Sequence, residues 1–237
     1  MPGTLLLFDI DGTLIRASEA GQTAYIKTIR TLYHVTVDLG AVQISGKTDL
    51  ANLRALVEAY DLDPRLAKDD DLVATYLHHL RETVQADPGV VCPGVRWLLD
   101  TLAVQRDMRL ALGTGNLESG ARIKLAAHGL NIFFPTGGFG SDAAERAEVI
   151  AAGIAKAEAW FGERFAKVVV VGDTPLDVAC ARANGVHSIA VATGAFGLEE
   201  LRQAGATLVL PDLTGTKAFV DAVGALAPTG QVEEEVG

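Results

Sequence analysis

The sequence has few cysteines, no excess of basic charge and no long apolar run. The two cysteines, Cys92 and Cys180, lack the spacing of metal ligands. A chain of 237 residues needs no disulfide to stabilise it, so we expect reduced thiols and a cytoplasmic protein. The 20 basic and 30 acidic residues give a formal net charge of −10. That balance argues against nucleic acid as a partner, because phosphates bind basic surfaces.

The apolar segment near the N-terminus is far shorter than a membrane span and lacks a signal-peptide pattern. We therefore expect no membrane partner. Residues 228–237 include three consecutive glutamates, and we expect them to form a disordered acidic tail. Hydrophobic residues make up 49% of the chain and charged residues 21%, a composition typical of a globular protein with a well-filled core.

Short apolar runs alternate with helical patterns over most of the chain. The expected strands are residues 4–9, 109–114, 133–138, 167–173, 187–193 and 207–210. Strands that alternate with helices predict a parallel sheet. The expected fold class is therefore α/β, with a Rossmann-like parallel sheet and helices on both of its faces.

The first connection breaks this alternation. Between Thr13 and Pro88 the sequence shows no convincing strand but three helical patterns, at residues 18–34, 48–60 and 67–85. Such a connection is too long for a loop and too regular for a linker. We expect an inserted all-helical cap subdomain at residues 16–89. The catalytic core would then comprise residues 1–15 and 90–227, with the insertion as a lid that excludes water.

The first strand ends in two carboxylates. Residues 5–8 are apolar without alternation, as in a strand buried on both faces, and Asp9, Asp11 and Gly12 follow at once. Buried charge is costly unless something compensates it, and a bound cation is the obvious compensator. The pattern predicts an acidic metal site at the carboxyl end of a central strand, where open α/β sheets bind ligands.

A second apolar strand ends in Asp173, and Asp177 follows beside Pro175 at an expected helix start. Alone, this pattern favours an N-capping Asp with a second acid that complements the helix dipole. The functional interpretation is that both strand ends face one crevice. Asp9, Asp11 and Asp173 would then suit Mg²⁺, which takes oxygen ligands.

A third strand ends in Thr114, Gly115 and Asn116. A hydroxyl and free backbone N–H groups can hold a phosphate there, and an ordinary helix cap is the alternative. Arg146 lies on an expected helix at residues 142–160. It is either a surface ion-pair partner or a cation that offsets clustered carboxylates and phosphate.

Histidines and serines show no catalytic arrangement in this sequence, and no Ser–His–Asp or Cys–His pattern can be found. His78 and His79 are adjacent on an expected helix. We expect them to point in different directions and not to bind a metal.

Four segments together resemble the ordered motifs of the haloacid dehalogenase superfamily. They are Asp9-Ile10-Asp11-Gly12-Thr13-Leu14, Thr114, a later basic residue, and Gly172-Asp173-Thr174-Pro175-Leu176-Asp177. The resemblance covers nearly the whole chain, and the helical insertion is similar to the cap of the phosphoglycolate phosphatase-like branch. It implies a Mg²⁺-dependent phosphatase that acts on a small phosphorylated metabolite.

The resemblance also implies roles for the acidic residues. Asp9 would be the nucleophile that forms an aspartyl-phosphate, and Asp11 would protonate the leaving oxygen and then activate water. Asp9 and Asp173 would bind Mg²⁺ through their carboxylates, and Asp11 through its backbone carbonyl. Asp177 would bind the metal directly or through a water. Dehalogenases of the superfamily need neither metal nor the second acid, so Asp11 and Asp173 favour a phosphatase.

The second and third motifs would hold the phosphoryl group. The resemblance assigns its oxygens to Thr114 and to backbone groups of Gly115 and Asn116. The third motif of many relatives is a Lys followed by Pro, and no Lys-Pro occurs here. Arg146 takes that role in our interpretation, with Lys156 as its rival. Arg and Lys are not equivalent, because a planar fork replaces a point charge.

Residues 45–49 of the insertion resemble the loop that relatives lower toward the substrate. Lys47 would there bind an anionic leaving group. The alternative is a helix N-terminus with Thr48 or Ser45 as its cap.

Other functions on the same pattern remain open. A sugar phosphomutase uses the same nucleophile but returns the phosphoryl group to a sugar. A phospho-accepting signalling module also gathers carboxylates at strand ends but lacks the helical insertion, and a non-catalytic binding protein would not need both Asp9 and Asp11. The physiological substrate is open, and both a monomer and a homodimer are compatible with the sequence.

Overall fold

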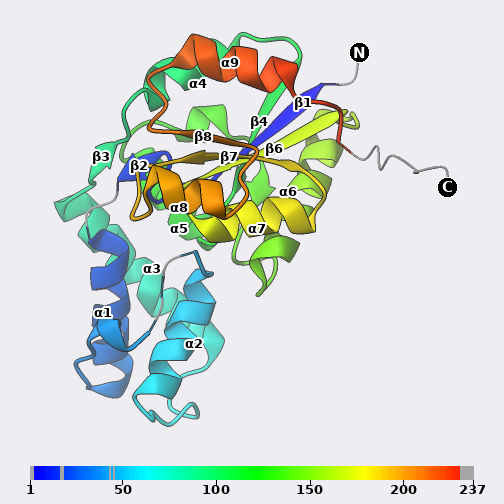
Figure 1. Cartoon of the computed structure of the whole chain (residues 1–237). Helices are drawn as coiled ribbons and strands as arrows, with labels where there is room; N and C mark the ends of the chain where they lie inside the picture. Colours follow the sequence, from blue (N-terminus) through cyan, green and yellow to red (C-terminus); the bar gives the residue numbers. More distant parts are fainter. Residues whose placement is uncertain (1–2, 17–18, 43, 45, 230–237) are drawn as a thin grey trace, which may run out of the picture.

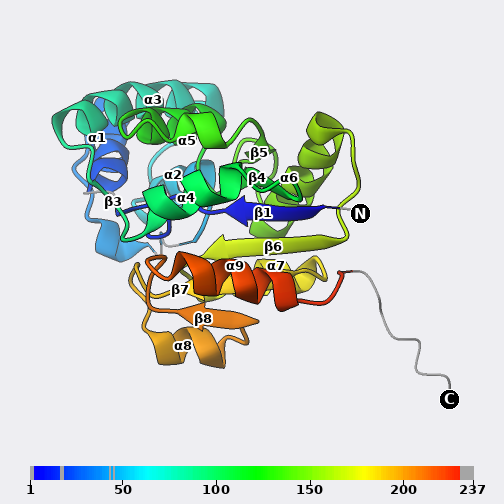
Figure 2. The ribbon, with the colours of Figure 1, turned by 90° about the horizontal axis from the view of Figure 1, so that it is seen from above.

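The computed structural model describes residues 3–16, 19–42, 44 and 46–229. Six parallel strands form the central sheet in the order β5-β4-β1-β6-β7-β8, with helices on both of its faces (Figure 1). Figure 2 shows β1, β6, β7 and β8 side by side. The strands are β1 (Thr4–Phe8), β4 (Met108–Gly113), β5 (Gly137–Gly138), β6 (Lys167–Gly172), β7 (His187–Val191) and β8 (Leu208–Leu210). The expected α/β class is confirmed.

Side chains of β1 alternate between two apolar cores, which explains why its apolar run shows no alternation with polar residues. Phe8 lies in one core with residues of α4 and α9, and Leu7 lies in the other with residues of α6 and α7. The helices of this part are α4 (Val95–Ala103), α5 (Glu118–Ala126), α6 (Arg146–Phe161), α7 (Pro175–Ala183), α8 (Leu198–Gln203) and α9 (Thr216–Ala225).

Between β1 and α4 the chain forms helices with a core of their own. They are α1 (Ala20–Tyr33), α2 (Asp49–Ala59) and α3 (Asp69–Ala86), and they lie apart from the sheet (Figure 1). Their shared core includes Ile29, Leu53 and the stacked rings of Tyr25 and Tyr76, whose centroids are 4.9 Å apart. The expected all-helical insertion is therefore present.

Two sequence predictions about strands are wrong in detail. β2 (Ile15–Arg16) pairs antiparallel with β3 (Val90–Val91), although no strand was expected after Thr13. Two residues are too few to show a period in the sequence. The strand expected at 133–138 is only Gly137–Gly138, because Pro135 cannot donate a ladder hydrogen bond.

Other features of the chain bear on its environment. Cys92 and Cys180 are free and buried. No helix within the described ranges is long and apolar enough to cross a membrane. Most of the expected acidic tail, residues 230–237, lies outside the described residues.

Candidate active site

The carboxyl ends of β1, β4 and β6 meet at a cavity of about 700 Å³. The insertion contributes Tyr25, Lys47 and Asn52 to its wall. Every site residue expected from the sequence lines this cavity except Asp177, which is 2% exposed. The cavity residues expected from the sequence are Asp9, Asp11, Lys47, Thr114, Gly115, Asn116, Arg146 and Asp173.

Four buried charges form what we call the Asp9 group: Asp9, Asp173, Asp177 and Arg146. Asp9 directly follows β1 and Asp173 directly follows β6. Asp177 lies in the first turn of α7, and Arg146 is the first residue of α6. Carboxylate oxygens of the three aspartates lie within 4.8 Å of one another. Arg146 Nη2 is 2.6 Å from Asp177 Oδ1 and 3.3 Å from Asp9 Oδ1. One guanidinium thus pairs with two of the three carboxylates, and Asp173 has no ion pair with it.

The Asp9 group holds more negative charge than its single cation offsets. Burial raises the pKa of Asp9 to about 6, although the Arg146 guanidinium acts to lower it. Burial, followed by the charges of Asp177 and Asp9, raises the pKa of Asp173 to about 9. A hard divalent cation takes carboxylate oxygens as ligands and would remove this imbalance, so the residues present fit such an ion.

Two of the guanidinium nitrogens of Arg146 donate no hydrogen bond to the described residues. Its Nε and Nη1 are buried and have no hydrogen-bond partner among the described residues. Buried donors without partners are costly, and an Arg fork matches phosphate oxygens well. Thr114 points its hydroxyl at the Asp9 carboxylate from the end of β4. The cavity is therefore equipped for an anion beside Asp9.

Two glycines allow the Asp173 carboxylate to lie where it does. A β-carbon on Gly12 would lie 2.2 Å from Asp173 Oδ2, and one on Gly194 would lie 1.7 Å from the same atom. Gly12 also has φ +84°, a conformation that other residues rarely adopt. The Thr13 hydroxyl donates to Asp173 Oδ1 at 3.1 Å. The local sequence after β1 therefore positions a side chain that follows β6.

Both carboxylate oxygens of Asp177 accept hydrogen bonds. Thr174 caps α7, and its N–H and hydroxyl donate to Asp177 Oδ2 at 3.1 and 2.7 Å. Arg146 donates to Asp177 Oδ1. The helix-capping interpretation therefore applies to this segment, but Thr174 rather than Asp173 is the N-cap residue.

A second set of side chains, which we call the Asp11 group, comprises Asp11, Asn116 and Lys124. Lys124 Nζ lies 2.8 and 2.7 Å from the two Asp11 oxygens and 2.6 Å from Asn116 Oδ1. Asn116 Nδ2 donates to Asp11 Oδ2 at 2.7 Å and to Thr114 Oγ1 at 2.8 Å. Burial acts to lower the pKa of Lys124, but Asp11 and Asp49 outweigh it and raise that pKa.

Lys124 was missed in the sequence analysis. It lies on the buried face of α5 with Ala121 and Leu125. This i, i+3, i+4 spacing puts a lysine on an apolar helix face, which is the signal that would have singled it out. Of the two candidates for the third motif, Arg146 belongs to the Asp9 group. Lys156 instead pairs with Asp142 at 2.6 Å.

The segment before α2 contacts the core. Thr48 is the N-cap of α2 and accepts from the Ala51 N–H at 3.3 Å, while Lys47 lines the cavity. The Asp49 N–H donates to Gly115 O at 2.9 Å. The helix-cap alternative is therefore correct for Thr48, whereas Ser45 lies outside the described residues. That Lys47 binds an anionic leaving group stays a prediction.

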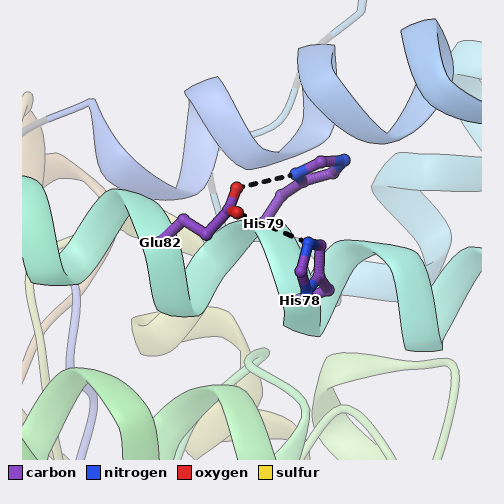
Figure 3. Close-up of side chains that lie close together, drawn as sticks. All are labelled: His78, His79 and Glu82. Atoms are coloured by element: carbon purple, nitrogen blue, oxygen red, sulfur yellow. Dashed lines mark hydrogen bonds and ion pairs between the residues drawn. The ribbon is translucent and has the colours of Figure 1, made fainter.

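Another cluster with metal-ligand side chains lies on α3 and comprises His78, His79 and Glu82 (Figure 3). The two rings are tilted by 60° to each other, and both contact Glu82, at 3.4 and 3.2 Å. That they do not bind a metal stays a prediction. Thr31 hydrogen-bonds the other nitrogen of His79, and Lys27 lies 4.0 Å from Glu82. These partners already balance the cluster, in contrast to the Asp9 group.

Comparisons with known proteins agree with this geometry. A family model described as haloacid dehalogenase-like hydrolase matches residues 4–185. The phosphoglycolate phosphatase of Rhodospirillum rubrum is 29% identical over 214 residues, covering 87% of this chain and 86% of that protein.

Solved structures share the fold. CbbY from Rhodobacter sphaeroides in complex with phosphate has a TM-score of 0.70 at 19% identity, over 91% of this chain and 96% of that one. A hydrolase from Pseudomonas syringae has a TM-score of 0.70 at 20% identity, over 93% and 98%.

Proposed function

This chain belongs to the haloacid dehalogenase-like hydrolases, and we propose that it is a Mg²⁺-dependent phosphatase that hydrolyses a small phosphomonoester through an aspartyl-phosphate. The observation that carries the proposal is the Asp9 group, in which a buried carboxylate at the end of the central strand faces two further carboxylates and an arginine with free donors. This set suits a nucleophile, a divalent cation and a phosphate at one place.

In the first step, an Asp9 oxygen attacks phosphorus and the bond to the ester oxygen breaks. The carboxylic acid form of Asp11 gives its proton to that leaving oxygen and becomes a carboxylate. In the second step, Asp11 takes a proton from water, the water oxygen attacks phosphorus, and inorganic phosphate leaves while the Asp9 carboxylate is restored. Splitting one displacement into two is the general advantage of a covalent nucleophile.

The attack brings an anion toward a phosphate, so the surrounding charge has to be balanced. A Mg²⁺ held by Asp9, Asp173 and the Asp11 backbone, with Asp177 acting directly or through a water, would supply that balance. Arg146 would offer its free Nε and Nη1 to the phosphoryl oxygens. Thr114 and the backbone groups of Gly115 and Asn116 would hold the remaining oxygens, at the start of α5.

We also propose the division into a catalytic core of residues 1–15 and 90–227 and a cap of residues 16–89. The apolar cluster formed mainly by α1, α2 and α3, with Leu117 and Ile123 of the core packed at its edge, supports it, as does the pairing of β2 with β3 where the chain leaves and re-enters the core. With two buried free thiols, a cytoplasmic setting is the natural one.

The cap wall suggests the substrate class. Lys47 and Arg16 line the cavity in addition to the cations of the Asp9 and Asp11 groups, so an ester with a second negative group would be bound. Phosphoglycolate, the substrate named for the Rhodospirillum relative, has such a group in its carboxylate, and we propose an acidic phosphomonoester of this kind.

The test is phosphate release from a panel of small phosphomonoesters, with and without Mg²⁺, by the wild-type protein and Asp9→Asn. We expect release that needs Mg²⁺, is fastest for carboxylate-bearing esters and is lost in Asp9→Asn. Release that persists in the variant would rule out the proposed nucleophile. Absence of release together with interconversion of sugar phosphates would indicate the mutase instead.

A further inference from the structure

All three hydrogen-bond donors of the Lys124 ammonium group contact other members of the Asp11 group. The side chain is 7% exposed, and its three contacts go to both oxygens of Asp11 and to Asn116 Oδ1. An ammonium has three donors, so none is left for another partner. Such a fully used, buried cation holds its acceptors in one arrangement.

The contact with Asn116 fixes a second donor to Asp11. Because Lys124 donates to the amide oxygen, the amide nitrogen of Asn116 must face the other way, toward Asp11 Oδ2 and Thr114 Oγ1. The Asp11 side chain is 41% exposed and would otherwise be free to change rotamer. Lys124 thus restrains this carboxylate both directly and through Asn116.

A purely structural role for Lys124 would be to neutralise the buried Asp49 of the cap. The hydrogen bonds of Asp49 argue against it. Its oxygens accept from Tyr25 Oη at 2.5 Å, Tyr76 Oη at 3.2 Å and the Leu117 N–H at 2.8 Å. Both carboxylate oxygens of Asp49 therefore accept hydrogen bonds without a direct bond from Lys124. The donors of Lys124 contact Asp11 and Asn116 instead.

We propose that Lys124 is a positioning residue that holds the Asp11 carboxyl group where, in its acid form, it can pass its proton to the leaving oxygen of the substrate. The proposal rests on the proposed function. It predicts that loss of Lys124 harms only those reactions in which the leaving oxygen needs a proton. An alkyl phosphate has such a leaving group, whereas 4-nitrophenyl phosphate does not, because nitrophenolate is stable without one.

The experiment compares kcat/KM for an alkyl phosphomonoester and for 4-nitrophenyl phosphate, since kcat/KM reports the steps up to formation of the aspartyl-phosphate. In Lys124→Met we expect kcat/KM to fall about 100-fold for the alkyl ester, in the range of general acid catalysis, and less than about threefold for the aryl ester. An equal fall for both esters, or no fall, would overturn the proposal.

A second variant, Lys124→Arg, keeps the proposal testable if Lys124→Met fails to fold. It keeps a positive charge near Asp49 but moves the donors, because a planar fork replaces a compact ammonium. The ratio of the two kcat/KM values should still fall, by about tenfold, and an unchanged ratio would contradict the positioning role. Lys156→Met is the matched control, since Lys156 pairs with Asp142 outside the cavity, and it should change neither value. A wild-type protein that hydrolyses neither ester in Mg²⁺ would instead refute the proposed function itself.

Discussion

The Asp9 group and the Asp11 group begin two residues apart in the chain but are built differently. In the Asp9 group one guanidinium pairs with two of three clustered carboxylates, and two of its nitrogens have no partner among the described residues. In the Asp11 group one ammonium, one carboxylate and one amide are fully hydrogen-bonded to one another and to Thr114.

This difference separates a set of charges that is complete from one that needs ligands. A buried ion is stable when its geometry satisfies its charge and its hydrogen bonds. The Asp11 group meets that condition with its own residues. The Asp9 group meets it only with an added cation for the carboxylates and an added anion for the arginine, as expected of a site where perturbed groups gather for binding.

Removing the one cation of the Asp9 group should have the largest effect. Arg146→Met leaves three buried carboxylates without a cation among them, so we expect a loss of about 3–5 kcal/mol in the free energy of unfolding without metal at pH 8. Urea denaturation measures it. Lys156→Met removes an exposed ion pair and should cost less than about 1 kcal/mol. Equal losses in the two variants would show that the Asp9 group is not short of positive charge.

Removing one carboxylate from the Asp9 group should relieve its shortage of positive charge. Asp173→Asn relieves repulsion from Asp9 and Asp177, so the metal-free variant should melt at a higher temperature than the wild type. Adding Mg²⁺ at about 100 times its Kd should stabilise the wild type by about 2.7 kcal/mol and leave the variant unchanged. Calorimetric melts with and without Mg²⁺ report both effects, and a variant that still responds fully would remove Asp173 from the ligand set.

The raised pKa values of Asp9 and Asp173 predict a pH dependence. A carboxyl whose pKa is raised by folding stabilises the folded state fully below its unfolded pKa of about 4, and that contribution is lost as pH rises through the folded value. For Asp173 the folded value is about 9. The metal-free protein should therefore lose about 1 kcal/mol per pH unit between pH 6 and 8.5. Asp173→Asn should flatten this slope, and an equally steep slope in the variant would assign it to other groups.

The smallest expected effect leaves both groups intact. Lys47 lines the cavity from the cap segment, so Lys47→Ala should raise KM about tenfold for a carboxylate-bearing ester, or about 1.4 kcal/mol. The kcat value and the KM of a neutral ester should stay close to those of the wild type. Steady-state kinetics on the two esters measure these values. Unchanged KM values for both esters would show that Lys47 does not bind the substrate.

Every member of the Asp9 group could be named from the sequence, as could Asp11 and Asn116 of the Asp11 group, but Lys124 could not. Asp9 and Asp173 each follow an apolar strand, and the carboxyl ends of parallel strands meet at one edge of a sheet. The partner of Asp11 is Lys124, which lies 113 positions later on a helix whose residues show no motif. Contacts between such distant elements depend on tertiary packing, which local patterns do not encode.

The short β2–β3 pair has a consequence for the engineering of the chain. The strand that leaves the core, Ile15–Arg16, is hydrogen-bonded beside the strand that returns, Val90–Val91. Since the two ends of the insertion are neighbours in space, a change in the length of the segment between them need not separate the strands that lead out of and back into the core. New substrate preferences can thus be grafted onto an unaltered set of reacting groups.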